Sequence, residues 1–356
     1  MSVVYQRPPI RVALMGLGRA MFADHYSVFR AHPALFKVVA ACDLVRERRD
    51  RIAPEFPDCR MFRRFEDMLD ERDIDLVDIA TPSVDHVQHA LESLSHGHWT
   101  LVESPLALTL DDAKLLRGAA VKAKNRLLVC QRGMFASEFQ LARMAMADAR
   151  LGEIYDIRIR REDFVRRDDW QTVKRLGGGA AYYAMPDLVL QALKLLPMPP
   201  IQMWSELKRI ASLGDAEDCA HLILKTRGNA TADIEFNGGV LECSRSPAFT
   251  IRGERGVFSV AAGATEGVFR VIDPDFRFPR RRSSVRTPDI VDLHESVPVR
   301  EFPLALPKGT LSGPSAFWRH VYDTVRTAAE FPLALDDSIE AIRLCHLMKK
   351  TSPFGK

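Results

Sequence analysis

The chain has 356 residues, which is long enough for two domains and a large hydrophobic core. Hydrophobic residues make up 47% of the chain and charged residues 27%, as in an ordinary globular protein. The formal net charge of +3 is too small to indicate binding to nucleic acid or to a membrane surface, and we expect neither partner.

The first predicted elements, within residues 10–43, occur in the order strand, tight turn, helix and strand. Apolar runs at 12–15 and 38–42 predict the strands, a glycine-rich turn follows the first run, and the segment 21–30 is compatible with a helix. Asp43 comes directly after the second apolar run. This order is that of the first βαβ unit of a dinucleotide-binding domain.

The residues of the glycine-rich turn suit a dinucleotide. Gly16 permits a sharp turn, and Gly18 lets a pyrophosphate approach the backbone at the start of a helix. Asp43 lies about 25 residues later, where an acid holds ribose hydroxyl groups and repels a 2′-phosphate, so NAD is favoured over NADP. Met21 occupies the third glycine position of the pattern. Arg19 either contacts a phosphate or lies on the surface. The predicted cofactor residues of this unit are Gly16, Gly18, Arg19, Ala20 and Asp43.

Strands and helices continue to alternate up to residue 130, which predicts a doubly wound parallel sheet. Thr81 and Pro82 end one of the strands, because proline cannot continue the hydrogen-bond ladder, and doubly wound sheets place ligands at such carboxyl ends. The predicted strands are 61–62, 76–80, 100–103 and 127–130, and the predicted helices are 45–53, 65–70, 86–95 and 110–124.

From residue 154 onward the hydrophobic pattern alternates, which predicts an α+β domain with a large, mainly antiparallel open sheet. We expect closing helices at 315–329 and 336–349, and a surface loop at 273–307, which is rich in proline and arginine. One face of the sheet must be covered by these helices or by a second subunit. The predicted strands are 155–160, 202–210, 221–225, 231–236, 240–244, 249–252, 256–260 and 269–272.

Features of the whole chain indicate its organisation and location. The predicted domains are residues 8–130 and 131–356. No apolar run is long enough to span a bilayer, and the N-terminus lacks the apolar core of a signal peptide. The six cysteines form no Cys-x-x-Cys pair, and two of them, Cys42 and Cys130, lie in apolar runs. Reduced thiols of this kind are typical of a cytoplasmic protein, which we expect here.

Four short motifs carry a resemblance to a known family. They are Thr-Pro-Ser-Val-Asp-His at 81–86, Ala-Leu at 90–91, Gly-His at 97–98 and Val-Glu-Ser-Pro-Leu-Ala-Leu-Thr at 102–109. In these motifs the chain resembles the glucose-fructose oxidoreductase/inositol dehydrogenase/rhizopine catabolism (Gfo/Idh/MocA) family. The resemblance is dense over residues 10–135 and extends more weakly to the glycine run at 177–179.

The resemblance implies a Rossmann domain followed by a domain on an open mixed sheet, with homo-oligomers formed through that sheet. It implies NAD(P)-dependent oxidation of sugars, cyclitols and related alcohols. His86 and His89 lie one helical turn apart without a third ligand, so we expect no metal site. The further cofactor residues that we expect are Thr81, Pro82, His86, Glu103 and Arg132.

Three positions where the family carries catalytic residues are changed in this chain. The family pattern Glu-Lys-Pro reads Glu-Ser-Pro at 103–105, and serine supplies neither the charge nor the proton acceptor of the lysine. After the glycine run, where the family usually has Asp and, four residues on, His, this chain has Tyr183 and Asp187. Residues four apart share a helix face, but Pro186 favours a helix that begins near Met185, which would separate the two side chains.

Two interpretations of these residues stay open. In the first, Tyr183 transfers a proton with Asp187 and Ser104 as hydrogen-bonding partners, and Tyr183→Phe abolishes turnover. A tyrosine needs a lowered pKa to act as a base near pH 7, and Arg132 and Arg167 are candidates for that effect by neighbourhood. In the second, Tyr183 is a packing residue and Asp187 is a solvated or helix-capping one.

The sequence therefore supports one function and leaves other classes open. We expect an oxidoreductase-like protein that binds NAD(H) and a sugar-, polyol- or cyclitol-type ligand between its domains, with Trp170 and Tyr182 as candidate sugar-stacking residues. The alternative is a catalytically silent NAD-binding, regulatory or scaffold protein of the same fold. A third, weaker option is non-redox chemistry with tightly held NAD.

Overall fold

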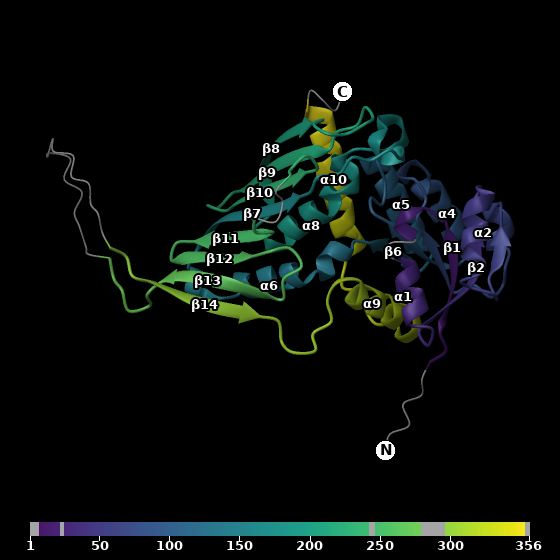
Figure 1. The fold of residues 1–356 in the computed structure, drawn as a ribbon, viewed down its shortest axis with the longest axis horizontal. Helices are drawn as coiled ribbons and strands as arrows, with labels where there is room; N and C mark the ends of the chain where they lie inside the picture. The colour runs from purple at the N-terminus through teal and green to yellow at the C-terminus, as the bar shows by residue number, and fades with distance from the viewer. Residues whose placement is uncertain (1–6, 22–24, 242–245, 279–295, 353–356) are drawn as a thin grey trace, which may run out of the picture.

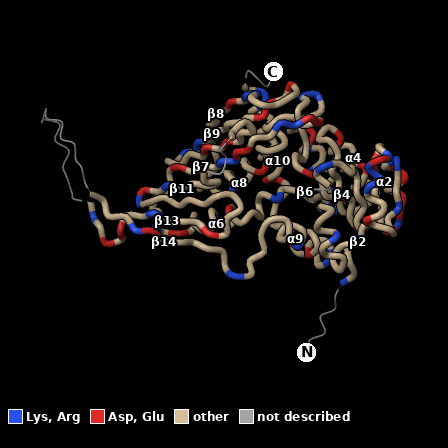
Figure 2. Tube along the Cα trace, viewed as in Figure 1, with Lys and Arg blue, Asp and Glu red and all other residues tan. Residues whose placement is uncertain are grey.

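The computed structural model describes residues 7–21, 25–241, 246–278 and 296–352 of the chain. Two sheets form its framework, a parallel one near the N-terminus and a larger, mainly antiparallel one (Figure 1). Lys and Arg are interspersed with Asp and Glu over both parts (Figure 2). None of the described helices combines the length and the apolar character that a membrane span requires.

The N-terminal sheet consists of the strands β1 (Ile10–Met15), β2 (Phe36–Cys42), β3 (Arg60–Phe62), β4 (Leu76–Ile79), β5 (Trp99–Glu103) and β6 (Leu127–Cys130). All of them run parallel, in the order β3-β2-β1-β4-β5-β6. The order reverses between β1 and β4, where doubly wound sheets place ligands. The connecting helices are α1 (Tyr26–Ala31), α2 (Arg46–Ile52), α3 (Phe65–Leu69), α4 (His86–Ser95) and α5 (Leu110–Lys122).

The C-terminal sheet consists of β7 (Ile154–Glu162), β8 (Pro200–Lys208), β9 (Cys219–Thr226), β10 (Thr231–Asn237), β11 (Phe249–Gly253), β12 (Gly256–Val260), β13 (Glu266–Ile272) and β14 (Val299–Ala305). Their order is β14-β13-β12-β11-β7-β10-β9-β8. Strands β7 and β10 pair in parallel, whereas the other neighbouring pairs are antiparallel. Along β10 the buried residues Ala232, Ile234 and Phe236 alternate with partly exposed ones, so one face of the sheet belongs to the core.

Four helices pack on the inner face of this sheet: α6 (Ser137–Met146), α7 (Ala180–Tyr183), α8 (Met185–Leu195) and α10 (Leu335–Thr351). Figure 1 shows α8 and α10 between this sheet and the N-terminal domain. The strand residues that alternate with the buried ones therefore point to the opposite, outer face.

The last two helices connect the two sheets. Helix α9 (Gly313–Thr327) returns to the N-terminal domain, where Trp318 packs edge-on against Phe29 and Phe36 and Arg326 pairs with Asp75. Helix α10 contacts α5 of the first domain as well as α8 and β8 of the second. These contacts hold the domains in one arrangement and give the space between them a defined shape.

The predicted elements of residues 10–130 are present, although the helix predicted at 21–30 lies only partly within the described residues. Two predictions for the second domain are wrong, and one helix is missing from them. The loop predicted at 273–307 contains β14, whose Pro303 is tolerated because β14 is an edge strand. The strand predicted at 240–244 does not form at 240 and 241, and 242–245 lie outside the described residues. No element is predicted at 137–146, where α6 forms.

Candidate active site

The glycine-rich turn follows β1 directly. Gly16 has a φ of +89°, and a Cβ at this position would lie 2.8 Å from the backbone nitrogen of Thr81, so only glycine fits between the ends of β1 and β4. At Gly18, in contrast, a Cβ would meet no atom within 4 Å. The space beside Gly18 is what the approach of a pyrophosphate to this backbone requires.

Asp43 holds this turn against the end of β2. Its side chain is buried, with 6% of the residue exposed. One carboxylate oxygen accepts a hydrogen bond from the backbone N–H of Leu17 at 2.8 Å, and the other accepts one from Val45 at 2.8 Å. Arg48 Nη1 lies 3.4 Å from the first oxygen. The oxygen that Val45 contacts keeps a second lone pair, so the residues present fit a dinucleotide whose ribose donates a hydroxyl hydrogen to Asp43.

A cleft of about 990 Å³ between the two domains brings together every residue predicted for the cofactor and catalytic sites. Trp170 lines the same cleft. Tyr182 does not line it, and its hydroxyl donates a hydrogen bond to the backbone oxygen of Leu108 at 2.9 Å. The predicted residues that line the cleft are Gly16, Gly18, Arg19, Ala20, Asp43, Thr81, Pro82, His86, Glu103, Ser104, Arg132, Tyr183 and Asp187.

His86 supports the turn at the end of β4. Its imidazole is buried, with Nδ1 2.8 Å from the backbone oxygen of Pro105 and Nε2 2.9 Å from that of Thr81. The ring thereby joins the turns that follow β4 and β5. His86 is held by backbone groups on both nitrogens, and it does not form a metal pair with His89, whose Nδ1 lies 3.2 Å from the Thr81 hydroxyl.

Beneath the cleft lies a buried histidine that the sequence analysis does not single out. His25 Nδ1 lies 2.6 Å from Asp78 of β4, and His25 Nε2 lies 2.6 Å from Glu103 of β5. Burial disfavours a charged ring, but the two carboxylates raise the pKa of His25 well above its usual value. The signal for this group is Asp78, because a carboxylate in the apolar run 76–79 needs a buried partner.

Glu103 extends this network to the cleft. Burial opposes its charge, but Arg132, 3.3 Å away, and His25 lower the pKa of Glu103 to about 2, so it stays ionised. Its second oxygen accepts a hydrogen bond from the Ser104 N–H at 3.0 Å. Cys130 Sγ is also close to His25, but burial raises the pKa of this thiol to about 12. A protonated thiol beside a doubly hydrogen-bonded imidazole fits a hydrogen-bond network better than a metal site.

Asp187 reaches the cleft from the first turn of α8, which begins at Met185 as Pro186 favours. Its Oδ2 accepts a hydrogen bond from the backbone N–H of Gly133 at 3.0 Å, and a Cβ on Gly133 would lie 2.8 Å from this oxygen. Its Oδ1 is buried and has no hydrogen-bond partner among the described residues. Burial raises the pKa of Asp187 to about 6. A carboxylate of this kind accepts a proton near neutral pH.

Tyr183 belongs to the separate short helix α7, so the two side chains do not share one regular helix face. Its ring packs edge-on against Phe236 of β10, with 5.4 Å between the ring centres. The Arg167 guanidinium lies 4.9 Å from the centre of the same ring. Burial raises the pKa of Tyr183 further above its usual value, despite Arg167. The phenol is therefore protonated at neutral pH, which suits a hydrogen-bond donor better than a base.

The chain after Arg161 adds a second wall of the cleft. Every second residue of the extended segment lines it: Arg161, Asp163, Val165, Arg167 and Asp169. Just beyond this segment, Gln171 accepts a hydrogen bond from Arg19 of the glycine turn at 3.1 Å, so the second domain reaches over the first. Of Arg161 and Arg167, only Arg167 is named among the sequence predictions, and the signal that places both on one side of the segment is their even spacing along an extended chain.

Comparisons with known proteins identify the family. Residues 10–131 match the model of the oxidoreductase family with an NAD-binding Rossmann fold, and residues 139–259 match the model of the GFO/IDH/MocA C-terminal domain. The chain belongs to the Gfo/Idh/MocA family. The predicted resemblance and the predicted fold, a Rossmann sheet followed by a large, mainly antiparallel sheet, are therefore confirmed.

This Gfo/Idh/MocA protein is similar over most of its length to several curated proteins and solved structures. An uncharacterized oxidoreductase of Schizosaccharomyces pombe is 28% identical over 258 residues, or 70% of each chain. The D-glucoside 3-dehydrogenase of Escherichia coli is 27% identical over 72% of this chain and 77% of its own. Among solved structures, an NAD-binding protein from Listeria innocua has a TM-score of 0.81 at 18% identity, covering 97% of this chain and 98% of its own. The WlbA dehydrogenase of Bordetella pertussis, in complex with NADH and UDP-GlcNAcA, has a TM-score of 0.75 at 21% identity, covering 96% of each chain.

Proposed function

We propose that the protein is an NAD-dependent dehydrogenase that oxidises a hydroxyl group of a sugar-, polyol- or cyclitol-type ligand in the interdomain cleft. The observation that carries this proposal is the Asp187 carboxylate. It lines the same cleft as the glycine turn, its Oδ1 lacks a hydrogen-bond partner among the described residues, and burial brings its pKa to about 6. The names of relatives such as D-glucoside 3-dehydrogenase support this class of substrate.

The cofactor would be held by the first domain. The backbone at Gly16 and Gly18 would meet the pyrophosphate, and Asp43 would accept hydrogen bonds from the ribose. When bound, NAD⁺ supplies the acceptor for the hydride that leaves the ligand carbon. Asp43 favours NAD over NADP through repulsion of a 2′-phosphate, although Arg48 beside it reduces that repulsion.

The residues of the chain itself accept the proton of the ligand and hold the ligand in place. Asp187 Oδ1 takes the proton of the reacting hydroxyl while the C–H bond breaks, so the alcohol becomes a carbonyl, and Asp187 releases the proton to solvent afterwards. The protonated Tyr183 donates a hydrogen bond to the oxygen of the reacting hydroxyl. Ser104 forms a hydrogen bond with a neighbouring hydroxyl of the ligand. Glu103 and Arg132, whose charges neutralise each other, border this end of the cleft.

The test compares Asp187→Asn with Asp163→Asn, which removes the same charge from an exposed residue of the same cleft. We expect Asp187→Asn to lower kcat by roughly 10²- to 10⁴-fold, the usual contribution of a general base, with the dissociation constant for NADH nearly unchanged. Asp163→Asn should retain activity. In the wild type, kcat/KM for oxidation should rise as the pH rises through about 6 and then level off, because the ionised form of Asp187 accepts the proton.

Tyr183→Phe separates the two assignments of the base. A moderate loss of activity is expected if the phenol only donates a hydrogen bond, and the acidic limb of the pH profile should stay in place. Complete loss in Tyr183→Phe together with full activity in Asp187→Asn would assign the proton transfer to Tyr183. A protein that binds NADH and turns over none of a panel of sugars, polyols and cyclitols would favour the catalytically silent alternative, which the serine at position 104 keeps open.

A further inference from the structure

We infer that the ligand of the cleft carries an anionic substituent, a carboxylate or a phosphate monoester, and that Arg161 and Arg167 bind it. This inference rests on the proposed dehydrogenase function and narrows its substrate class. The carboxylate and phosphate forms share one chemistry, because the planar guanidinium fork binds two oxygens of either group. The experiment below distinguishes them.

Both arginines reach the cleft through the alternation of an extended chain. In β7 the side chains of Ile157 and Ile159 point to the buried inner face of the sheet. Arg161 continues this face beyond the part that the helices cover, and it pairs in register with Phe236 of β10, which also lines the cleft. Arg167 lies six residues further along the same side. The segment therefore places both arginines along the wall of the cleft that Tyr183 also lines, Arg167 half-buried and Arg161 more exposed.

Arg167 shows an unmet binding capacity. Its Nη1 is buried and has no hydrogen-bond partner among the described residues. Within the same residues, no carboxylate lies within ion-pair distance of the Arg167 guanidinium. The cation–π contact with the Tyr183 ring supplies no lone-pair acceptor for this Nη1. Buried N–H donors are nearly always satisfied in folded proteins, so a bound acceptor is the expected partner.

The acids that line this part of the cleft do not neutralise the two arginines. Asp163 accepts a hydrogen bond from the N–H of Phe164, and Asp169 caps the turn at Gln171 and lies 3.9 Å from Arg19. Glu103 is paired with Arg132 and His25. Asp187 lines the cleft, its Oδ1 is buried without a hydrogen-bond partner among the described residues, and burial opposes its own charge. An excess of positive charge remains beside the ring of Tyr183.

The two arginines and the proposed proton acceptor are close enough to interact. The charge of Arg161 lowers the pKa of Asp187, and Arg161 and Arg167 repel each other. Two like charges held together in a partly buried wall are a cost to the folded protein that an anionic ligand removes. The anionic group of the ligand would then lie next to the reacting hydroxyl, as it does in a small sugar acid or sugar phosphate.

The test measures binding to the NADH-loaded protein by calorimetry. The probes are glucuronate and galacturonate, glucose 6-phosphate, and the neutral partners glucose, galactose and glucuronamide. We expect at least one acid to bind about tenfold or more tightly than its neutral partner, as a charge-assisted pair of hydrogen bonds provides. Arg167→Gln and Arg161→Gln should remove this preference, so that each weakens the acid more than its neutral partner. Preference for the carboxylates over glucose 6-phosphate, or the reverse, identifies the anion.

The control is Arg166→Gln, which removes the same charge from the exposed opposite side of the segment and should keep the preference. Arg167→Lys keeps the charge but loses the fork, so it should retain only part of the preference. Neutral sugars that bind as well as the acids would overturn the anion site while the dehydrogenase assignment stands. Equal losses in Arg166→Gln and Arg167→Gln would also overturn it. Failure of the wild type to bind NADH would reject both proposals.

Discussion

At the scale of single residues, the stability of the first sheet depends on a buried charged group, His25 with Asp78 and Glu103. Asp78 and Glu103 lie on neighbouring buried strands, and His25 bridges them at 2.6 Å on either side. Neither carboxylate would tolerate this depth alone, because an unpaired buried charge costs several kcal/mol. The imidazolium therefore stabilises both strand ends and fixes Glu103 at the edge of the cleft.

We predict that His25→Phe strongly destabilises the fold. A phenyl ring fills the space beside Trp318, whose ring centre lies 5.2 Å from that of His25. It leaves Asp78 without its partner and, among the described residues, Glu103 with Arg132 alone as a counter-ion. The free energy of unfolding should fall by about 3–5 kcal/mol, the usual cost of removing one member of a buried ion pair. Urea unfolding measures this loss. The control His32→Phe changes an exposed histidine and should stay within about 0.5 kcal/mol of the wild type.

The same measurement has a defined pH dependence. The folded pKa of His25 is raised above the usual 6.5, so its stabilising contribution is complete below about pH 6.5 and is lost as the pH rises through the folded value. The difference in unfolding free energy between wild type and His25→Phe should therefore shrink toward alkaline pH. A difference that grows with pH would contradict a charged His25.

The sequence allowed us to predict which residues line the site, but not which of them exchanges a proton. The sequence places Tyr183, Asp187 and Ser104 in one region through a family pattern, and the structure brings all three to one cleft. Whether Tyr183 or Asp187 exchanges a proton depends on burial and on the N–H of Gly133, which lies 54 positions away from Asp187. Contacts of this range cannot be read from local spacing.

At the scale of elements, the glycine turn separates folding from cofactor binding. Gly16 is required by the backbone, since its φ is +89° and a Cβ would lie 2.8 Å from the Thr81 nitrogen. Gly18 has no such constraint, and a Cβ there meets only open space. The two positions of this motif therefore require glycine for different reasons: Gly16 for the backbone conformation and Gly18 for the space that a cofactor needs.

We predict opposite consequences for Gly16→Ala and Gly18→Ala. Gly16→Ala should lower the unfolding free energy by roughly 1–3 kcal/mol, because the strained conformation and the close approach both oppose a side chain. Gly18→Ala should leave the melting temperature unchanged and weaken NADH about tenfold or more, because its methyl group takes the room of the pyrophosphate. Thermal unfolding and NADH titration of both variants test the pair. Unchanged NADH affinity in Gly18→Ala would argue against a cofactor at this turn.

Elements were predictable from sequence where their apolar pattern is strong and local. Five strands of the first sheet, all but the edge strand β3, read as apolar runs because they are largely buried. β14 was missed because Pro303 and the nearby arginines indicate a loop, whereas its pairing with β13 is decided by strand β13, about 30 residues earlier. The missed α6 lies under β11 and β12, and its role as a cover becomes visible only with the sheet in place.

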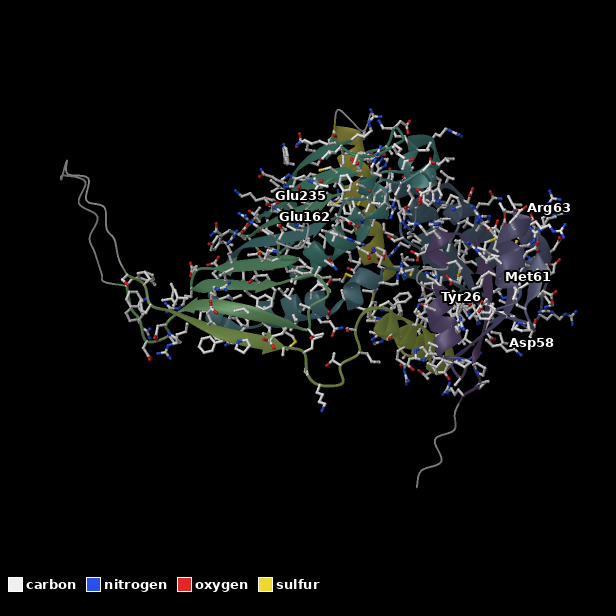
Figure 3. All side chains as sticks on the ribbon, in the orientation of Figure 1. Tyr26, Asp58, Met61, Arg63, Glu162 and Glu235 are labelled. Carbon is white, nitrogen blue, oxygen red and sulfur yellow. The ribbon has the colours of Figure 1, made fainter. Side chains whose placement is uncertain are left out.

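At the scale of the whole molecule, the outer face of the large sheet is the surface most suited to a second subunit. Its middle carries a charge ladder in which Arg160 pairs with Asp233 and with Glu235, the latter labelled in Figure 3. Beside this ladder lies Trp204 of β8, half exposed and edge-on to His221. A mixed surface of paired charges and one exposed aromatic ring is suited to a twofold contact with its own copy. We propose that the protein forms a homodimer through this face.

We therefore predict that the wild type has twice the chain mass of 40.1 kDa in solution and that Trp204→Glu yields monomers. A carboxylate at position 204 would be buried without a partner in the dimer, which costs more than the interface gains from this ring. The control is Leu115→Glu on α5 of the first domain: Leu115 is 54% exposed and lies outside the large sheet. Light scattering after size-exclusion chromatography gives the mass, and the melting temperature of each monomer checks its fold. A monomeric wild type, or equal dissociation by both substitutions, would show that the outer face is not the dimer interface. A dimer disrupted only by Trp204→Glu would place the cleft of each subunit, on the opposite side of its sheet, away from the contact.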